Sequence, residues 1–398
     1  MNSTLLLRRC FCCASTAPSS SSLSIKKKPL VFLGSPQVSA KVLDALFNAS
    51  QSSDSFFEVG YFKFTIAAIV TQPPARQNRG RKVMPSAVAQ YALDRGFYND
   101  LIFTPERASE EWFLANLRSL EPELCITAAY GNILSTKFLN IPKQGWYVNL
   151  VQRVSTVNIH PSLLPLYRGA APVQRALQDG VKETGVSLAF TVRALDAGPV
   201  LASQRTDVDI DIKAPDLLDF LFDLGVSAVN FFLASKSRSK LLLHELPSIL
   251  DGTARINAQP QDDSKATLAP KITPEESWLS FDQEAIILHN KVRAFAGWPG
   301  TRARVQIVDA ANAEENILDL KIITTKVPSS SRALNAEPDY VAFKNGALIF
   351  TCGGGTTLEV LEVQLPGKKA VNAAAFWNGL RGQKLKIVAD KGAAISQV

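Results

Sequence analysis

Residues that bind metals or form disulfide bonds are scarce in this chain. Its 398 residues include three histidines and five cysteines. Cys10, Cys12 and Cys13 lie close to the N-terminus, and Cys125 and Cys352 lie far apart in the sequence. This spacing fits neither a disulfide framework nor a zinc site, and no apolar run reaches the ~18 residues that cross a bilayer. We therefore expect no metal site and no association with a membrane.

Acidic residues are missing from the first part of the chain, where the first one is Asp44. Residues 1–28 instead hold Arg8, Arg9 and three lysines among many serines. This composition is typical of an organelle transit peptide, and the apolar run is too short for a secretory signal. We expect residues 1–28 to be such a peptide and the protein to be mitochondrial, in the matrix, with a plastid as the alternative. A disordered tail is the other interpretation.

Apolar runs and helical patterns alternate from about Leu30 onward. The runs at 30–33, 64–70 and 124–128 predict strands, and the alternation is typical of a doubly wound, mostly parallel α/β sheet. Ligands bind such sheets beyond the carboxyl ends of the strands. The turn after the first strand lacks the three-glycine dinucleotide fingerprint, so we do not predict NAD.

The alternation ends after about Leu246, and the length of the chain allows a second domain. Several short apolar runs near the C-terminus predict the strands of a small β-barrel, at 305–308, 318–323, 347–351 and 357–363. We therefore expect a catalytic domain over 29–248, a linker over 249–268 and a second domain over 269–398. The net charge of +7 suits a polyanionic partner, although part of it lies in the N-terminal segment.

Asn158 and His160 are the residues most suggestive of chemistry. They lie two apart, so on a strand both side chains point to the same face. An amide beside an imidazole can stabilise an oxyanion and move a proton at one place, and Asp196 could orient the imidazole or favour its charged form. Together these residues indicate acyl transfer to an amine. The alternative is a structural histidine, which is the role we assign to His244 and His289.

The run from Asn158 to Pro172 reads Asn-Ile-His-Pro-Ser-Leu-Leu-Pro-Leu-Tyr-Arg-Gly-Ala-Ala-Pro. Here the chain resembles the folate-dependent formyltransferases, most closely those that formylate methionyl-initiator tRNA. The resemblance extends from about Leu30 to the last residues. It implies a Rossmann-like catalytic domain, a tRNA-binding domain similar to an oligonucleotide-binding (OB) barrel, and 10-formyltetrahydrofolate as formyl donor, with no metal. It also implies catalytic roles for Asn158, His160 and Asp196, and we expect a monomer.

The same resemblance implies the residues that bind the folate. A flat pterin prefers apolar surface with a few backbone hydrogen bonds. The predicted folate-binding residues are Ser162, Leu163, Leu164 and Pro165 together with Ala129, Tyr130 and Gly131. Residues 195–198 would close the other side, although Val192, Arg193 and Ala194 depart from the family pattern just before Asp196.

A basic loop follows the second predicted strand and contains no acid. We predict that it binds tRNA phosphates through Arg76, Arg79, Arg81 and Lys82. A solvated charged surface is the alternative. Two rival functions also remain at this point: a folate-dependent formyltransferase acting on a small amine, such as glycinamide ribonucleotide or an amino sugar, and a catalytically impaired RNA-binding paralogue.

The connection before Asn158 is longer than in the resembling family. Removing residues 146–155 would leave Gly-Thr-Val-Asn-Ile-His, which is the ordinary pattern. The extra residues include Trp146, Tyr147 and Val148 and are too apolar for a comfortable surface loop. We expect them either to loop out before the catalytic strand or to shift it.

Overall fold

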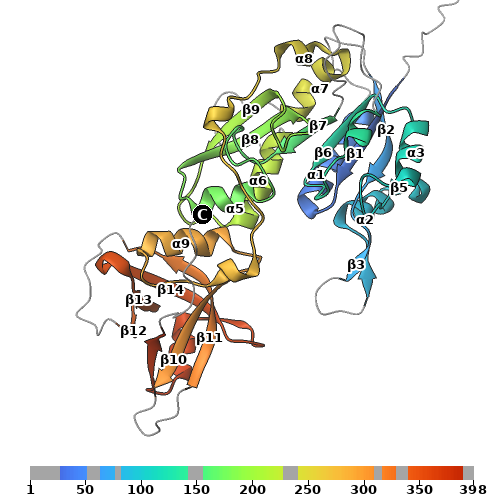
Figure 1. Cartoon of the computed structure of the whole chain (residues 1–398). Coiled ribbons are helices and arrows are strands. Elements are labelled where there is room, and N and C mark those ends of the chain that lie inside the picture. The colour runs from blue at the N-terminus through green and yellow to red at the C-terminus, as the bar shows by residue number, and fades with distance from the viewer. Residues whose placement is uncertain are drawn as a thin grey trace, which may run out of the picture.

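The computed structural model consists of an N-terminal α/β domain and a C-terminal β-barrel (Figure 1). It describes residues 27–51, 63–76, 82–141, 156–226, 241–308, 316–328 and 339–388. Nearly all of the predicted transit peptide, Arg79, Arg81 and residues 146–155 lie outside the described residues. The described helices are all too short or too polar to cross a membrane.

A seven-stranded sheet forms the centre of the N-terminal domain, in the order β5-β2-β1-β6-β7-β8-β9. The first five strands are parallel, whereas β8 pairs antiparallel with both β7 and β9. The mostly parallel sheet confirms the predicted fold class, and the antiparallel edge adds to it. The strands are β1 (Lys28–Gly34), β2 (Phe64–Val70), β5 (Ile102–Phe103), β6 (Leu124–Ala128), β7 (Thr156–His160), β8 (Glu183–Phe190) and β9 (Val200–Asp207).

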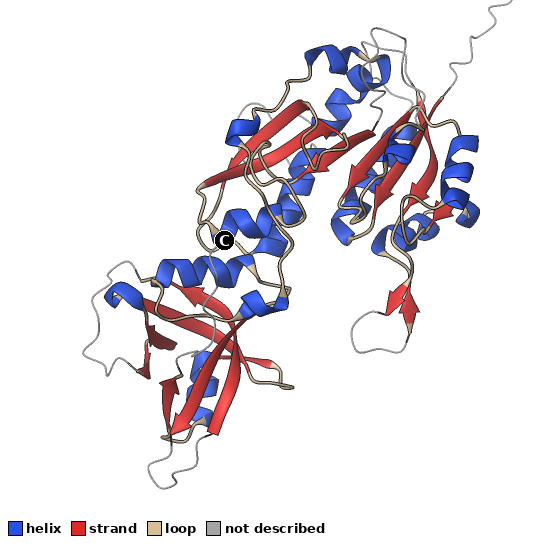
Figure 2. Cartoon of the chain, in the orientation of Figure 1, coloured by secondary structure: helices blue, strands red, loops and turns tan. Residues whose placement is uncertain are grey.

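Helices cover both faces of this sheet, and the side chains of β1 show why. Leu30 and Phe32 belong to one buried cluster with α1, whereas Val31 and Leu33 belong to a second cluster with α3. A strand that is buried on both faces has to be apolar there, as residues 30–33 of β1 are. Figure 2 shows the resulting mixture of helix and strand. The helices are α1 (Gln37–Gln51), α2 (Ala87–Asp94), α3 (Glu111–Ser119), α4 (Thr136–Leu139), α5 (Pro172–Gln178), α6 (Ala214–Val226), α7 (Leu241–Asp251) and α8 (Thr253–Asn257), with a short 3-10 turn η1 (Asn99–Leu101).

The register of the parallel strands brings three predicted segments to one edge. Gly34 pairs with Ala128, and Ala128 pairs in turn with Ile159, next to His160. The ends of β1, β6 and β7 therefore lie side by side, where ligands bind sheets of this kind. Asn158 lies opposite Thr127 of β6 and opposite Ala189 of β8. β7, which carries Asn158 and His160, follows the undescribed residues 142–155. It is paired on both sides, with β6 and with β8, and so occupies a regular position in the sheet.

We expect a chain lacking residues 146–155 to be more stable and more active than the full chain. The apolar residues of this segment, such as Trp146 and Leu150, would compete with Thr156–Ile159 for the same place in the sheet. The expected gain in Tm is about 2 °C or more, which is roughly 1 kcal/mol for a chain of this size. Thermal unfolding and formylation rates of the two chains test this. If the shorter chain is better in neither, residues 146–155 are an accommodated element of the fold.

The C-terminal domain is a closed antiparallel barrel of six strands, as the short apolar runs predict. The strands follow the order β11-β10-β16-β12-β13-β14, and pairing of β11 with β14 closes the barrel. Leu320, Leu348 and Val360 are fully buried inside it. The strands are β10 (Thr301–Val308), β11 (Asn316–Lys326), β12 (Tyr340–Lys344), β13 (Ala347–Thr351), β14 (Thr357–Gln364) and β16 (Lys384–Ile387). The other elements after the α/β domain are β15 (Ala370–Asn372), α9 (Ala285–Ala294), α10 (Ala373–Gly379) and the 3-10 turns η3 (Pro274–Ser277) and η4 (Gly353–Gly355). The 3-10 turn η2 (Asp263–Lys265) precedes the barrel and contacts Arg168 of the α/β domain through Asp263.

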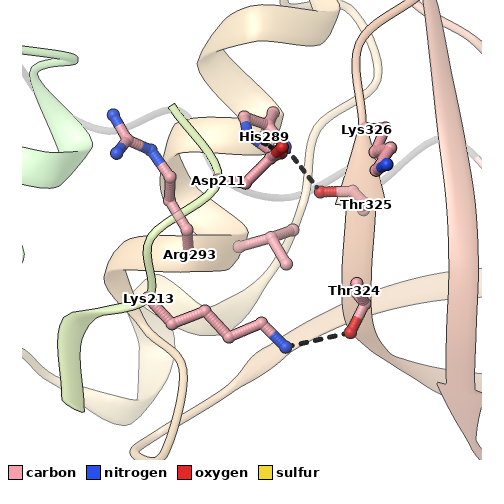
Figure 3. A pocket seen from close by; sticks show the side chains of 8 residues that line it. Asp211, Lys213, His289, Arg293, Thr324, Thr325 and Lys326 are labelled. Atoms are coloured by element: carbon pink, nitrogen blue, oxygen red, sulfur yellow. Dashed lines mark hydrogen bonds and ion pairs between the residues drawn. The ribbon is translucent and has the colours of Figure 1, made fainter. Parts of the chain in front are cut away.

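His289 of α9 lies where the two domains meet. Its Nδ1 is 2.9 Å from Thr325 Oγ1 of β11, and its Nε2 is 3.0 Å from the carbonyl of Ile210 in the α/β domain. His289 and Thr325 line a cavity of about 100 Å³ between the two domains (Figure 3). Lys213 of the α/β domain lines the same cavity and donates a 2.9 Å hydrogen bond to Thr324 Oγ1 of β11. Both ring nitrogens of His289 contact other residues of the protein, which fits the structural role that the sequence analysis assigns to it.

We expect this junction to lose stability in mild acid. Burial lowers the pKa of His289 below its ordinary value of 6.5, with the charge of Arg293 acting in the same direction. The unfolded chain therefore binds more protons, and the free energy of unfolding falls as pH decreases below that ordinary value. Denaturant unfolding at about pH 7.5 and about pH 5.5 measures how much the free energy of unfolding decreases between these two pH values. This decrease should be smaller for His289→Gln than for the wild type. His244→Gln serves as the control, because the His244 side chain is exposed. An equal decrease of the free energy of unfolding in all three proteins would contradict the prediction.

Candidate active site

Asn158 is held in one orientation by a neighbouring strand. The hydroxyl of Thr127 on β6 donates a 2.7 Å hydrogen bond to Asn158 Oδ1. Since the amide oxygen is engaged in this way, the two amide hydrogens point to the other side, where they can act as donors. The side chain is partly exposed at the carboxyl edge of the sheet. Asn158 therefore presents the donors that an oxyanion requires.

His160 is almost fully buried, with 4% of its surface exposed. Its Nε2 lies 2.9 Å from the carbonyl oxygen of Tyr167. Its Nδ1 lies 3.8 Å from Asp196 Oδ2, which is longer than a hydrogen bond but within the range of a charge–charge contact. The structure thus brings together the imidazole and the carboxylate that the sequence analysis singles out.

Asp196 is oriented by the backbone around it. Its Oδ2 accepts a 2.9 Å hydrogen bond from the N–H of Gly169, and Gln261 Nε2 donates to the carbonyls of Asp196 and Gly198. A side chain on Gly198 would meet the Phe190 carbonyl at 1.7 Å, so this tight turn requires glycine. The carboxylate consequently stays beside the imidazole, although the turn begins after residues that depart from the family pattern.

The predicted folate-binding loop after β7 is fixed by hydroxyl groups. Ser162 is fully buried and donates to the carbonyl of Leu166, while Ser187 of β8 links Ser162 and Leu164. Ser162 therefore shapes the loop from inside. The loop keeps Leu163, Leu164 and Pro165 only partly buried.

The other predicted folate-binding segment follows β6 at the same edge. Ala129 and Gly131 both have positive φ angles, of 46° and 85°, and both are exposed. Tyr130 is buried, and its carbonyl accepts hydrogen bonds from Ser35 Oγ and Gln72 Nε2. Ser35 lies in the turn after the first strand, which the sequence places at the ligand-binding edge. Gln72 follows β2 and was not singled out from the sequence, although its position after a predicted strand could have indicated it.

A short hairpin on either side of the predicted basic loop lies away from the central sheet, as Figure 1 shows at β3. The hairpin consists of β3 (Ala75–Arg76) and β4 (Val83–Met84), which pair antiparallel. Arg76 and Lys82 are exposed at its two sides. Its remaining predicted cations, Arg79 and Arg81, lie outside the described residues.

Two family matches cover most of the chain. Residues 28–228 match the formyl transferase family, and residues 271–381 match the formyl transferase C-terminal domain. The chain belongs to the formyl transferase family. Among its relatives, the methionyl-tRNA formyltransferase of Thermotoga neapolitana is 32% identical over 90% of this chain and 96% of that protein. The methionyl-tRNA formyltransferase of Nitrosococcus oceani is 33% identical over 88% and 92%.

Solved formyltransferase structures share the fold at lower sequence identity. A sugar 3N-formyltransferase crystallised with dTDP and 5-N-formyl-THF superposes with a TM-score of 0.54, at 14% identity over 86% of this chain and 99% of that chain. An N-formyltransferase of Helicobacter canadensis in complex with folinic acid and dTDP-3-aminofucose gives 0.52, at 13% identity over 84% and 99%. These likenesses support the formyltransferase fold and carry no information on the substrate of this chain.

Several groups of this candidate site come from distant parts of the chain. Thr127 orients Asn158, the Tyr167 carbonyl contacts His160, and Gln261 holds the turn that carries Asp196. Among the residues that the structure describes, no three histidine, cysteine or acidic side chains gather as metal ligands would. The described groups at the centre of the site include an amide, an imidazole, a carboxylate and backbone polar atoms.

Proposed function

We propose that this chain transfers the formyl group of 10-formyltetrahydrofolate to the amino group of methionyl-initiator tRNA, for translation initiation in an organelle. The juxtaposition of Asn158, His160 and Asp196 at the carboxyl edge of the sheet carries this proposal. Relatives named methionyl-tRNA formyltransferase, which align over almost their whole length, support the choice of tRNA over a small amine.

The surfaces beside this trio suit a folate. Leu195 is 61% exposed directly next to Asp196, and Leu163 and Leu164 are partly exposed on the loop after β7. Apolar surface of this kind, with backbone N–H and carbonyl groups around it, fits a flat heterocycle. When bound, the folate supplies the formyl group and the nitrogen from which that group departs.

Each residue of the trio has a distinct task in the proposed reaction. Attack of the amine places negative charge on the formyl oxygen, and the amide hydrogens of Asn158 stabilise that charge. His160 takes the proton that the amine loses and returns a proton to the departing nitrogen. Asp196 stabilises the imidazolium that exists between these two transfers.

A formylation assay tests the proposed activity directly. The purified chain, 10-formyltetrahydrofolate and methionyl-initiator tRNA should yield formylmethionyl-tRNA. Glycinamide ribonucleotide and a nucleotide-linked amino sugar, offered separately, should remain unmodified. Formylation of a small amine without formylation of the tRNA would replace this proposal with the small-amine function, and binding of tRNA without any transfer would favour the impaired paralogue.

The organellar part of the proposal rests on residues 1–28. Their basic, serine-rich and acid-free composition supports import into mitochondria. A fluorescent protein fused behind residues 1–28 should appear in the mitochondrial matrix of plant and animal cells. Fluorescence in plastids would move the reaction to that organelle, and diffuse fluorescence would remove the organellar role.

We expect Arg79→Ala to weaken tRNA binding and to make it less dependent on salt. Each phosphate contact releases counterions, so log affinity falls with log salt concentration, and losing one contact lowers that slope by about 1. Titrations of tRNA at several salt concentrations measure both quantities. Arg118→Ala, which removes an exposed cation of α3, is the matched control. A wild-type affinity that does not change with salt would contradict the proposed role of the basic loop.

A further inference from the structure

The backbone at Tyr167 has an unusual conformation next to His160. Its φ angle is +58°, a region that residues with a side chain seldom occupy. In this conformation the Tyr167 carbonyl oxygen lies 2.9 Å from His160 Nε2. A conformation of this kind persists only where surrounding contacts hold it.

Thr267 supplies two of those contacts from a segment that is remote in sequence. Its Oγ1 accepts a 2.8 Å hydrogen bond from the N–H of Tyr167, and its carbonyl accepts a 2.8 Å hydrogen bond from the N–H of Arg168. The Arg168 N–H and the Tyr167 carbonyl belong to the same peptide unit, and in a trans peptide they point in opposite directions. The Thr267 hydroxyl holds the Tyr167 N–H and the Thr267 carbonyl holds the Arg168 N–H, so the backbone is fixed on both sides of the Tyr167 Cα. Both contacts together aim the Tyr167 carbonyl at His160.

The contact with the carbonyl decides which nitrogen of His160 carries a hydrogen. A carbonyl oxygen can only accept a hydrogen bond, so Nε2 has to be the donor. In the neutral ring, Nδ1 then has the free electron pair. The same segment also serves Asp196, because the N–H of Gly169, two residues after Tyr167, donates to Asp196 Oδ2, which lies 3.8 Å from Nδ1.

We propose that Thr267 is a positioning residue that fixes His160 in its Nε2–H form, so that Nδ1 is the atom that exchanges protons. This inference rests on the proposed function. Nδ1 takes the proton released by the attacking amine and gives it to the nitrogen from which the formyl group departs, so the ring ends neutral with its Nε2–H unchanged. The proton resides beside the Asp196 carboxylate between these two steps.

Nitrogen NMR of the histidine rings tests the proposal without any assay of activity. With ¹⁵N-labelled histidine at about pH 8.5, where histidine rings are ordinarily neutral, the His160 signals should be those of the Nε2–H form in the wild type. Their absence from His160→Gln assigns them. Thr267→Ser keeps the hydroxyl acceptor and should look like the wild type, whereas Thr267→Val should show the Nδ1–H form as well. The proposal would be overturned if His160 of the wild type showed the Nδ1–H form. It would also be overturned if His160 of Thr267→Val showed only the Nε2–H form.

Kinetics distinguish positioning from a general loss of stability. We expect kcat of Thr267→Val to fall roughly tenfold, the usual size of one lost hydrogen bond, with KM for tRNA nearly unchanged and recovery in Thr267→Ser. Thr356→Val is a matched control, since Thr356 Oγ1 accepts from the Ala285 N–H in the barrel.

The outcomes separate this inference from the function on which it rests. If Thr356→Val and Thr267→Val lose stability and activity to the same extent and His160 keeps its Nε2–H form in both, the role of Thr267 is merely structural and the inference fails. A wild-type chain that shows the Nε2–H ring but formylates no methionyl-tRNA would refute the proposed function while the positioning of His160 by Thr267 stands.

Discussion

Replacing His160 with alanine is expected to lower kcat by about 10²- to 10⁴-fold, the usual contribution of a general acid–base residue. The imidazole is buried between the Tyr167 carbonyl and Asp196, and alanine leaves no ring at that place to carry the proton. Binding of folate and tRNA should change little, since the ring acts on the reacting atoms.

Single-turnover formylation of methionyl-tRNA measures this effect apart from product release. His244→Ala is the control, because that ring is exposed on α7 and should leave the rate unchanged. Turnover of His160→Ala close to that of the wild type would remove His160 from the mechanism. A uniform loss in both variants would instead point to a general defect of the preparation.

The second large effect is expected for Asp196→Asn, with kcat lower by about 10²-fold or more. The asparagine oxygen can still accept from the Gly169 N–H, so the turn keeps its shape. It lacks the negative charge that lies 3.8 Å from His160 Nδ1, and the imidazolium loses its stabilisation. The substitution therefore removes the charge of residue 196 and keeps the geometry of the turn.

Comparison with Asp219→Asn gives this measurement its control, since Asp219 pairs with Lys41 on the surface of the same domain. Affinities for folate and tRNA should stay near those of the wild type in both variants. A kcat for Asp196→Asn within a few-fold of the wild type would mean that the carboxylate only supports the turn around Gly198.

Patterns that extend over a few residues predict much of this fold. The predicted strands 64–70 and 124–128 coincide with β2 and β6, because an apolar run bounded by turn residues is enough to identify a buried parallel strand. The Asn158–His160 spacing likewise depends only on the alternation of side chains along a strand. The short strands β13 and β14 are recognisable for the same reason.

Features that depend on pairing between distant segments cannot be predicted in this way. The direction of β8 follows from its pairing with β7 and β9, and nothing in its own residues distinguishes it from a parallel strand. Thr127 contacts Asn158 only because β6 and β7 share one register. Thr267 contacts Tyr167 across 100 positions of sequence, so its place in the site becomes visible only in three dimensions.

The short parallel bridge between Arg168 and Leu268 affects where the chain can be cut into independently folding units. Residues 261–269 lie between the two family matches, yet they supply Gln261 to the turn at Asp196 and Thr267 to the loop at Tyr167. An independently folding catalytic unit would therefore have to extend to about residue 270. Chimaeras that exchange the barrel for that of a relative should be joined after this segment, because a joint at residue 228 would combine the connecting segment of one parent with the catalytic loop of the other.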